Sequence, residues 1–189
     1  MIHPWQKIGG PQELAKRFGK SLYIQNLRTS KGNKLEWVFF RVHDFSMVLP
    51  ITENLEVITV KQYRPGSDRI SHELPAGSME SSTEKFSDLI TRELEEETGY
   101  KAGEITKLGT FPIHTASSPT LVYLFLATGC TPTGQIHTDQ NEEIEVKLVP
   151  LKEWVEMALD GEIKEPWSSL TTMLAIKNIN KKLGLKFDC

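Results

Sequence analysis

The sequence predicts an α/β or α+β layered fold, because segments typical of strands alternate with segments typical of helices along most of the chain. Apolar or alternating runs over 106–111, 120–128 and 144–148 indicate strands. The clearest helical pattern, over about 82–98, separates these runs from other strand-like segments nearer the start of the chain. A chain of 189 residues is long enough for one such domain with its own core and a small appendage.

The first 45 residues predict a small antiparallel β segment. Residues 21–28 and 35–42 favour strands, and the polar stretch 29–34 between them favours a turn. A segment of this size is too small to be stable alone, so we expect it to pack on the rest of this chain or on a second copy. We therefore divide the chain into an N-terminal β segment at 1–45 and a larger domain at 46–189.

The larger domain opens with a predicted β-hairpin. Strand-like runs at 47–52 and 55–63 flank a Glu-Asn pair, and turn-forming residues follow at 63–66. A further extended piece is expected at 71–76, where it is ended by a glycine.

The predicted helix at about 82–98 carries both terminal signals. Ser81 stands three residues before Glu84, as in a capping box, and Gly99 is a natural C-terminal cap. Its inward positions recur at spacings of three and four residues, at Phe86, Leu89, Ile90 and Leu94. This spacing predicts that one helix face packs on the sheet.

Two more helices are predicted near the end of the sequence, at 152–160 and 168–183. Gly161 follows the first and Gly184 the second, where each would end the helix. The second helix is expected to turn five apolar residues inward, namely Leu170, Met173, Leu174, Ile176 and Ile179.

Composition and charge exclude several classes of protein. The chain has 22 Lys and Arg against 25 Asp and Glu, a formal net charge of -3, so it lacks the basic excess that binds long nucleic acids or anionic membranes. No apolar run approaches the roughly 20 residues that cross a bilayer, and the first residues contain no apolar signal segment. We expect a cytoplasmic protein with Cys130 and Cys189 as free thiols, one disulfide between them being the alternative.

Three glutamates in the predicted helix indicate chemistry. Glu93, Glu96 and Glu97 stand at i, i+3 and i+4, so their carboxylates share one helix face. Each like-charge pair costs about 0.2–0.5 kcal/mol, and the C-terminal end of the helix dipole disfavours anions further. A bound divalent cation would offset both effects, and carboxylate oxygens favour Mg²⁺ or Mn²⁺. The alternative is a solvated acidic face without a ligand.

The residues around these glutamates resemble the Nudix box, the signature of the Nudix hydrolase family. The matching positions are Gly77, Glu84, Arg92, Glu93, Glu96, Glu97 and Gly99. Six residues separate Gly77 from Glu84 where the family has five, and Leu89-Ile90 replaces a small pair common before the Arg. The insertion falls in the loop ahead of the helix, where a change of length is tolerated.

The resemblance implies a Nudix α/β/α sandwich with a mixed sheet and a metal-dependent pyrophosphohydrolase activity. It implies that Glu93 and Glu97 are the principal metal ligands, and that Glu96 is a further ligand or a partner of metal-bound water. Arg92 would pair with Glu84 to hold the loop and the helix together. The expected ion is Mg²⁺ or Mn²⁺.

Two further motifs resemble the branch of ADP-ribose pyrophosphatases and nucleoside diphosphate sugar hydrolases. These motifs are Gln-Tyr-Arg-Pro at 62–65 and Glu-Leu-Pro-Ala-Gly at 73–77. The guanidinium of Arg64 is suited to clamp a diphosphate with two hydrogen bonds. The resemblance implies that Glu73 adds a carboxylate to the metal cluster and that the carbonyl of Ala76 is another ligand.

Other site residues are also implied by this branch. Glu142, or Glu143 beside it, would be the general base. Trp37 and Arg41 match positions that hold the base of the nucleotide, a role suited to a flat aromatic face and a stacking cation. His114 lies in the expected substrate loop, although an exposed histidine with no role is the alternative. Members of the branch are commonly homodimers with exchanged N-terminal sheets.

The expected activity is hydrolysis of ADP-ribose or a related nucleoside diphosphate sugar to a nucleoside monophosphate and a sugar phosphate. Position 115 is Thr, where enzymes specific for ADP-ribose usually carry Pro, so a GDP-mannose-type or broad-specificity hydrolase is the alternative within the family. The alternative of another class is a non-catalytic module that senses a nucleotide sugar. Three crowded carboxylates argue against that module, because binding alone does not need them.

Overall fold

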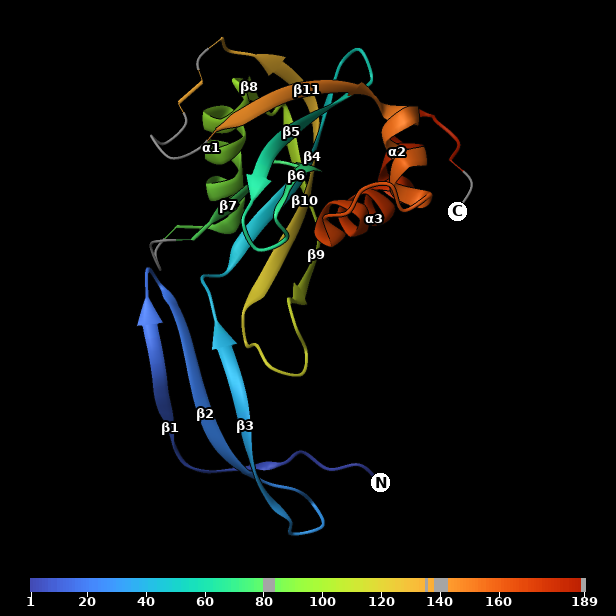
Figure 1. Ribbon diagram of the computed structural model, residues 1–189. Helices are drawn as coiled ribbons and strands as arrows, with labels where there is room; N and C mark the ends of the chain where they lie inside the picture. Colours follow the sequence, from blue (N-terminus) through green and yellow to red (C-terminus); the bar gives the residue numbers. More distant parts are fainter. Residues whose placement is uncertain (80–83, 135, 138–142, 188–189) are drawn as a thin grey trace. The chain divides into compact units, whose positions relative to one another are not determined.

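The computed structural model describes residues 1–79, 84–134, 136–137 and 143–187 (Figure 1). The chain divides into two compact units. One unit comprises Met1–Asp44 and Phe111–Val122, and the other comprises Phe45–Thr110 and Tyr123–Cys189. The predicted Glu142 and Cys189 lie outside the described residues.

The first unit contains a three-stranded antiparallel sheet. Its strands, in the order β1-β2-β3, are β1 (Gln6–Arg17), β2 (Lys20–Arg28) and β3 (Lys34–Arg41). The two strands predicted near 21–28 and 35–42 are therefore present. The sequence analysis missed β1, because Gly9, Gly10 and Pro11 are strand breakers. The sheet accommodates them by a shift of register between Ile8 and Gln12.

Residues 111–122 join the same unit through hydrogen bonds to β3 and to the residues that follow it. Phe40 N donates to Ser117 O at 3.0 Å. Thr120 Oγ1 donates to Val42 O at 2.9 Å and lies 3.2 Å from Val42 N. These contacts satisfy backbone groups that would otherwise remain unpaired in a small sheet.

The second unit is built on a larger sheet with the strand order β11-β5-β4-β10-β8, to which β6 adds on β5, β7 on β4 and β9 on β10. Its strands are β4 (Phe45–Thr52), β5 (Glu56–Arg64), β6 (Arg69–Glu73), β7 (Ala76–Ser78), β8 (Tyr100–Lys101), β9 (Glu104–Pro112), β10 (Leu121–Pro132) and β11 (Ile144–Pro150). The hairpin predicted from 47–52 and 55–63 is confirmed, since β4 and β5 pair antiparallel through Ile51 and Val57.

The extended piece predicted at 71–76 is two strands rather than one. β6 ends at Glu73 and pairs with β5, whereas β7 begins at Ala76 and pairs with β4. Leu74 and Pro75 separate them, because proline has no backbone N–H to give to a ladder. At this break the chain passes from pairing with β5 to pairing with β4.

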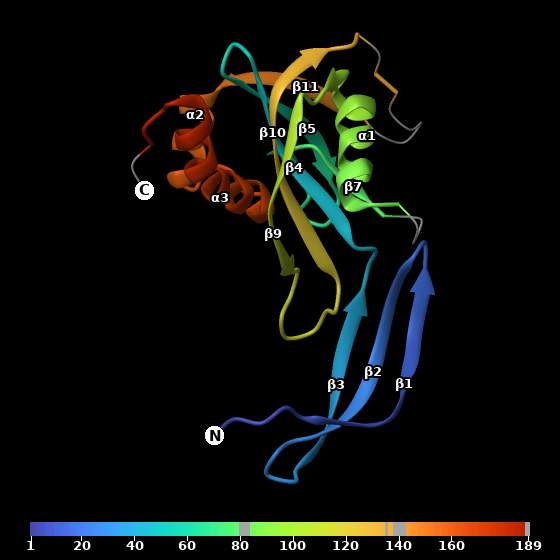
Figure 2. The same ribbon diagram turned by 180° about the vertical axis from the view of Figure 1, so that it is seen from behind.

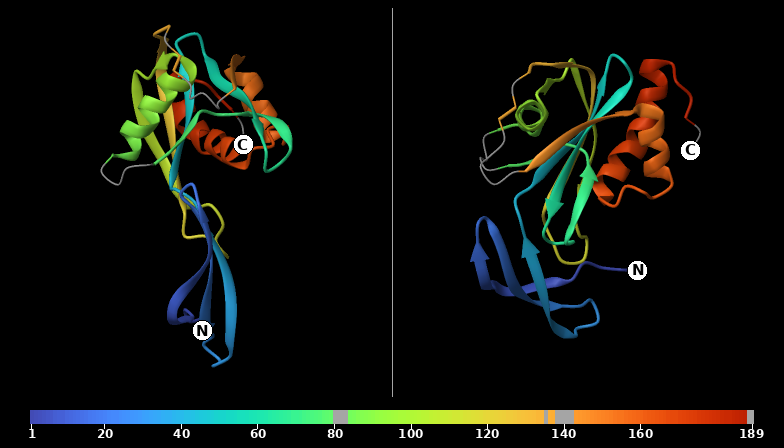
Figure 3. Two further views of the ribbon diagram at one scale, coloured as in Figure 1. Left: turned by 60° about the vertical axis from the view of Figure 1, so that its left-hand side comes forward. Right: turned by 45° about the horizontal axis from the view of Figure 1, so that its top comes forward.

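Helices cover both faces of this sheet. α1 (Phe86–Thr98) lies on one side, and α2 (Leu151–Leu159) and α3 (Pro166–Leu183) lie on the other (Figures 2 and 3). The expected α/β fold, an α/β/α sandwich, is thereby confirmed. The core between α1 and the sheet includes Val48, Ile58, Ile90, Leu94 and Phe125, all buried.

The start of α1 was predicted wrongly. The helix begins at Phe86 and its N-cap is Lys85, which makes no side-chain capping bond, so Glu84 precedes the helix and does not occupy the third position of a capping box. Ser81 lies outside the described residues. The other end follows the prediction, because Gly99 caps the helix in the left-handed conformation at φ 71°.

The inward face of α3 also differs from the prediction. Met173 is exposed, and Leu170 and Leu174 are only half-buried. The fully buried positions include Ser168, Thr171, Thr172 and Ala175 beside the predicted Ile176 and Ile179. The hydroxyls of Thr171 and Thr172 donate to carbonyls one turn earlier, at 2.6 and 2.8 Å, so these polar side chains can be buried at low cost.

Two further findings bear on the class of protein. Among the described residues, no helix is long and apolar enough to cross a membrane. Cys130 is a buried free thiol, and burial raises its pKa to about 11. Cys130 packs in the hydrophobic core, and a thiol with so high a pKa is a poor nucleophile at neutral pH.

Candidate active site

A cleft of about 1130 Å³ opens in the second unit. We name its two sides for the elements that supply them. The helix wall, from α1 and the turn before it, consists of Glu84, Arg92, Glu93, Glu96 and Glu97. The strand wall, from β5 and β6, consists of Gln62, Arg64, Arg69, Ser71 and Glu73. Ala76 and Gly77 of β7 also line the cleft, as do Lys164 and Glu165 at the start of α3.

Arg92 organises the helix wall. Its Nη1 lies 2.6 Å from Glu96 Oε2, its Nη2 lies 2.9 Å from Glu93 Oε1, and its Nε lies 3.4 Å from Glu84 Oε1. Burial alone would lower the pKa of the Arg92 guanidinium, but the neighbouring carboxylates, Glu93 first among them, raise it above its ordinary value. Arg92 therefore offsets the repulsion among the carboxylates and joins the turn at Glu84 to the helix.

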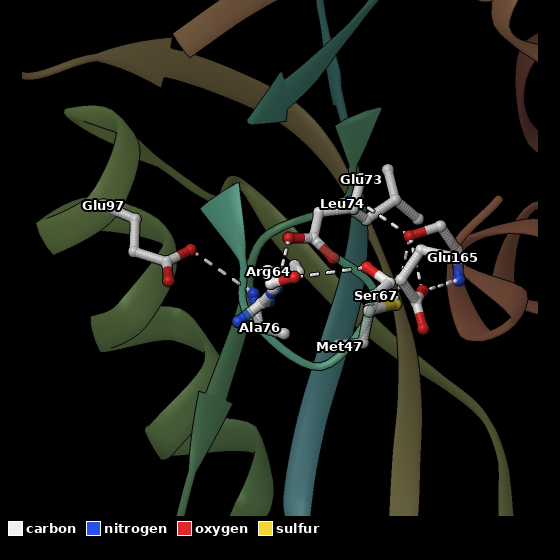
Figure 4. Close-up of polar contacts among 9 residues, drawn as sticks. Met47, Arg64, Ser67, Glu73, Leu74, Ala76, Glu97 and Glu165 are labelled. Atoms are coloured by element: carbon white, nitrogen blue, oxygen red, sulfur yellow. Dashed lines mark hydrogen bonds and ion pairs between the residues drawn. The ribbon is translucent and has the colours of Figure 1, made fainter. Parts of the chain in front are cut away.

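Glu97 is the most deeply buried carboxylate of α1. Its Oε2 accepts a hydrogen bond from Ala76 N at 3.3 Å, which ties the helix to the start of β7 (Figure 4). The next residue, Gly77, approaches the helix so closely that a Cβ there would lie 2.1 Å from Glu93 Cγ. Only glycine allows this contact, which explains why a glycine of the signature stands at this position.

Arg64 and Glu73 form the central pair of the strand wall. Arg64 Nε lies 2.7 Å from Glu73 Oε1 (Figure 4). Among the described residues, Arg64 Nη1 and Nη2 have no hydrogen-bond partner. The side chain of Glu73 is 1% exposed and that of Arg64 is 46% exposed, so the carboxylate fixes an arginine that still faces the cleft. Within the described part of the chain, Glu73 Oε2 has no hydrogen-bond partner.

Burial of Glu73 disfavours the charged form of its carboxyl group. Burial is the largest influence and raises its pKa, and Arg64 opposes this effect through its charge and its hydrogen bond. Among the described residues, Glu73 Oε2 is a buried carboxylate oxygen without a partner, a costly arrangement unless a ligand completes it.

The donor set of the cleft suits a hard divalent cation. All the side-chain donors of Glu93, Glu96 and Glu97 are carboxylate oxygens, the ligand type that Mg²⁺ and Mn²⁺ prefer. Among the described residues, no three His, Cys, Asp or Glu side chains are gathered as a metal-binding group. Arg92 pairs with Glu93 and Glu96, and Ala76 N donates to Glu97.

Comparison with known proteins identifies the family. A model of the NUDIX domain matches residues 42–170. The chain belongs to the Nudix family. It is 29% identical over 166 residues to the ADP-ribose pyrophosphatase of Bacillus subtilis (strain 168), covering 87% of each chain, and 25% identical over 140 residues to the methanol dehydrogenase activator of Bacillus methanolicus, covering 74% and 73%.

A solved structure described as an ADP compounds hydrolase has the same fold. It superposes with a TM-score of 0.84 at 17% identity, over 96% of this chain and 97% of that one. The family match and the pyrophosphatase relative show that this protein is a Nudix pyrophosphohydrolase resembling ADP-ribose pyrophosphatases. Nudix hydrolases generally need divalent metal ions, which fits the carboxylates of the helix wall.

The Nudix cleft brings together most of the residues predicted from the box and its flanks. Those that line it are Arg64, Glu73, Ala76, Arg92, Glu93, Glu96 and Glu97. Glu143 is exposed just before β11 and does not line the described cleft. The position of Glu142, the first choice for the general base, lies outside the described residues.

The predicted contacts to the nucleotide base lie in the first unit. Trp37 Nε1 donates to Ala116 O at 2.8 Å, and the rings of Trp37 and Trp5 are nearly perpendicular with centroids 5.8 Å apart. Arg41 is exposed, and the exposed His114 lies beside Phe40 at a centroid distance of 5.8 Å. Their roles toward a substrate therefore stay predictions.

Sequence reasoning missed several residues of the cleft. Arg69, His137, Lys164 and Glu165 line it but belong to no motif of the family signature. One signal was available, because Glu165 precedes a proline at the first position of α3, as is common at helix starts. It would have moved the predicted start of that helix from 168 to 166, beside the cleft.

Proposed function

We propose that this Nudix protein hydrolyses the pyrophosphate bond of ADP-ribose or a related nucleoside diphosphate sugar, giving a nucleoside monophosphate and a sugar phosphate in the cytoplasm. The observation that carries the proposal is one cleft in which the carboxylates of the helix wall and the available Nη1 and Nη2 of Arg64 occur together. Carboxylates coordinate divalent cations, and arginine donates hydrogen bonds to phosphate oxygens, so the two walls suit a metal-bound diphosphate.

Mg²⁺ or Mn²⁺ is the proposed cofactor, with Glu93, Glu97 and Glu96 as side-chain ligands and the carbonyl of Ala76 as a backbone ligand. When bound, the cation neutralises charge on the diphosphate and lowers the pKa of a coordinated water. Glu73 holds Arg64 by its Nε, so that Nη1 and Nη2 are presented to the diphosphate oxygens. Arg92 keeps the carboxylates of α1 in place without touching the reacting atoms.

The proposed general base is Glu142, with Glu143 as the alternative. A carboxylate just before β11 would take a proton from the attacking water. Single Gln substitutions at the two positions distinguish them. Replacing the true base should lower kcat by about 10²–10⁴-fold, which is the usual contribution of general base catalysis. Replacing the other glutamate should change kcat little.

The N-terminal β segment at 1–45 is proposed to serve the catalytic domain at 46–189 of a second copy in a homodimer with exchanged N-terminal segments. Several large apolar side chains of the segment are exposed, including Leu14, Phe18, Leu22 and Val38. In that dimer Trp37 and Arg41 would hold the nucleotide base and His114 would touch the substrate. A Trp37→Ala variant should then raise KM more than it lowers kcat.

The experiment that tests the function is phosphate release through a coupled phosphatase. The substrates are ADP-ribose, GDP-mannose, UDP-glucose, diadenosine polyphosphates and NADH, each with Mg²⁺ or Mn²⁺. Fast cleavage of a diphosphate sugar that EDTA abolishes supports the proposal, and the ranking separates ADP-ribose from the GDP-mannose-type or broad-specificity alternative. Tight binding of nucleotide sugars without any cleavage would instead make this chain a sensing module.

A further inference from the structure

The start of α3 is joined to the strand wall by a buried serine. Ser168 is fully buried, and its Oγ accepts a hydrogen bond from Leu74 N at 3.0 Å. Its own proton goes to Glu165 Oε2 at 2.9 Å, a stronger acceptor than Met47 Sδ at 3.6 Å. Glu165 Oε2 also accepts from Ser168 N at 2.6 Å, which caps the helix and fixes the serine.

The Leu74 amide lies between two residues that contact the cleft. It follows Glu73, which holds Arg64, and precedes Ala76, whose amide is bonded to Glu97. Because the chain changes its partner strand between β6 and β7, no ladder hydrogen bond is available to Leu74 N. Ser168 therefore supplies from α3 the contact that a neighbouring strand would otherwise provide.

The four residues 73–76 are held at four points. Arg64 binds Glu73, Ser168 binds the Leu74 amide, Val48 N donates to Pro75 O at 3.1 Å, and Glu97 binds the Ala76 amide. The contacts at Glu73 and Ala76 involve groups of the proposed diphosphate and metal sites. Of the other two, only the contact at Leu74 comes from a helix side chain, and that side chain is itself fixed by a residue of the cleft.

We infer that Ser168 and Glu165 are positioning residues for the Nudix reaction, which set the segment 73–76 so that Arg64 and Ala76 meet the diphosphate and its cation together. The inference rests on the proposed function and adds residues from α3 that the family signature does not contain. A displacement of a substrate-positioning group by about 1 Å can cost as much as 100-fold in rate, so a single backbone contact at this place matters for turnover.

A matched hydroxyl on the same helix separates this role from simple stabilisation. Thr172 is also fully buried, and its Oγ1 accepts from Trp154 Nε1 at 2.9 Å, a contact that joins α3 to α2. Loss of either hydroxyl leaves one buried N–H donor without its partner, and each loss costs stability by a similar mechanism. Only the Ser168 contact reaches the cleft.

The experiment compares Ser168→Ala with Thr172→Val by melting temperature, Mn²⁺ binding by calorimetry, amide hydrogen exchange over 69–78, and kinetics with ADP-ribose. We expect both variants to lose stability, but only Ser168→Ala to increase exchange at Leu74, to weaken Mn²⁺ binding and to lower kcat/KM about ten-fold. Glu165→Ala should reproduce the effect, and Glu165→Gln should restore most of it because the amide oxygen can still accept both bonds.

The outcomes are distinct. If Ser168→Ala matches Thr172→Val in kcat/KM and Mn²⁺ affinity, the serine only satisfies a buried amide and the inference is overturned. If Ser168→Ala does not fold, the Glu165 pair decides in the same way. If the wild-type chain cleaves no diphosphate sugar, the proposed function fails, and Mn²⁺ affinity then tests only the cation part of the inference. That part holds when only Ser168→Ala weakens Mn²⁺ binding, and it is overturned when neither variant does.

Discussion

The two walls of the cleft hold their charged side chains by different means. On the helix wall the charges hold one another, since Arg92 bridges Glu84, Glu93 and Glu96 on a partly exposed surface. On the strand wall one buried carboxylate, Glu73, fixes one arginine. The segment that carries Glu73 is in turn held by the neutral hydroxyl of Ser168.

This difference indicates which of the two walls can rearrange when a ligand binds. Partly exposed ion pairs contribute only about 0–1 kcal/mol each, so the carboxylates of the helix wall can exchange Arg92 for a cation at little cost. A buried carboxylate that loses its only cationic partner is strongly destabilised. We therefore expect the helix wall to respond to metal and the strand wall to stay as it is.

The largest expected effect comes from the helix wall. Glu97→Gln should lower metal-dependent kcat by about 10²–10³-fold or more, because it removes a charged ligand, while the melting temperature changes little. The amide oxygen of Gln can still accept from Ala76 N, so the fold is kept. Asp88→Asn is the control on the same helix, because Asp88 is exposed and does not line the main cleft. A Glu97→Gln variant with nearly unchanged kcat would show that Glu97 is not a metal ligand.

The next effect tests how closely β7 and the helix wall must approach. Gly77→Ala places a Cβ 2.1 Å from Glu93 Cγ, so the strand or the carboxylate must move. We expect a loss of about 1–3 kcal/mol in the free energy of unfolding, as for other overpacked sites, measured by urea denaturation. Gly66→Ala is the matched control, since a Cβ there meets nothing within 4 Å. Equal stability of the two variants would refute the close approach.

The sequence predicted the helix wall far better than the strand wall. The carboxylates of α1 are close together in the sequence, and helical spacing alone places Glu93, Glu96 and Glu97 on one face. The contact between Ser168 and Leu74 joins residues 94 positions apart, which no local periodicity reports. For the same reason the hydroxyl-lined face of α3 was predicted to be apolar. A pattern of apolar residues cannot show that a buried threonine is bonded to its own helix.

The errors at element boundaries also have physical causes. The helix α1 begins four residues later than expected because Glu84 pairs with Arg92 and does not cap the helix. Strand β1 was missed because its two glycines and a proline are accommodated by an irregular register. In both places a tertiary contact or a bulge overrides a local preference.

An intermediate effect is expected from the exposed side of the strand wall. Arg64→Lys keeps the charge but loses the planar fork of the guanidinium, so KM for a diphosphate sugar should rise about ten-fold while kcat falls less. Steady-state kinetics with the best substrate of the panel measures this split. Lys107→Arg, on β9 and outside the cleft, should leave KM unchanged. An unchanged KM in Arg64→Lys would mean that Arg64 serves Glu73 only.

The smallest effect tests the packing behind the strand wall. His72 Nε2 forms a hydrogen bond with Thr59 Oγ1 at 2.7 Å, and the same hydroxyl lies 3.2 Å from Lys147 O. Burial first, and then Lys61, lower the pKa of His72 below its ordinary value of 6.5. A histidine with a depressed pKa contributes stability that is present above pH 6.5 and is lost as the pH falls through its folded pKa.

The melting temperature of the wild type should therefore fall more steeply than that of His72→Gln between about pH 7 and pH 5, because protonation of the half-buried imidazole destabilises only chains that keep His72. The control is His3→Gln, since His3 is exposed. Identical slopes for all three proteins would show that the strand wall does not depend on a neutral His72. A steeper slope confined to chains with His72 would show that a neutral His72 stabilises the packing behind β6.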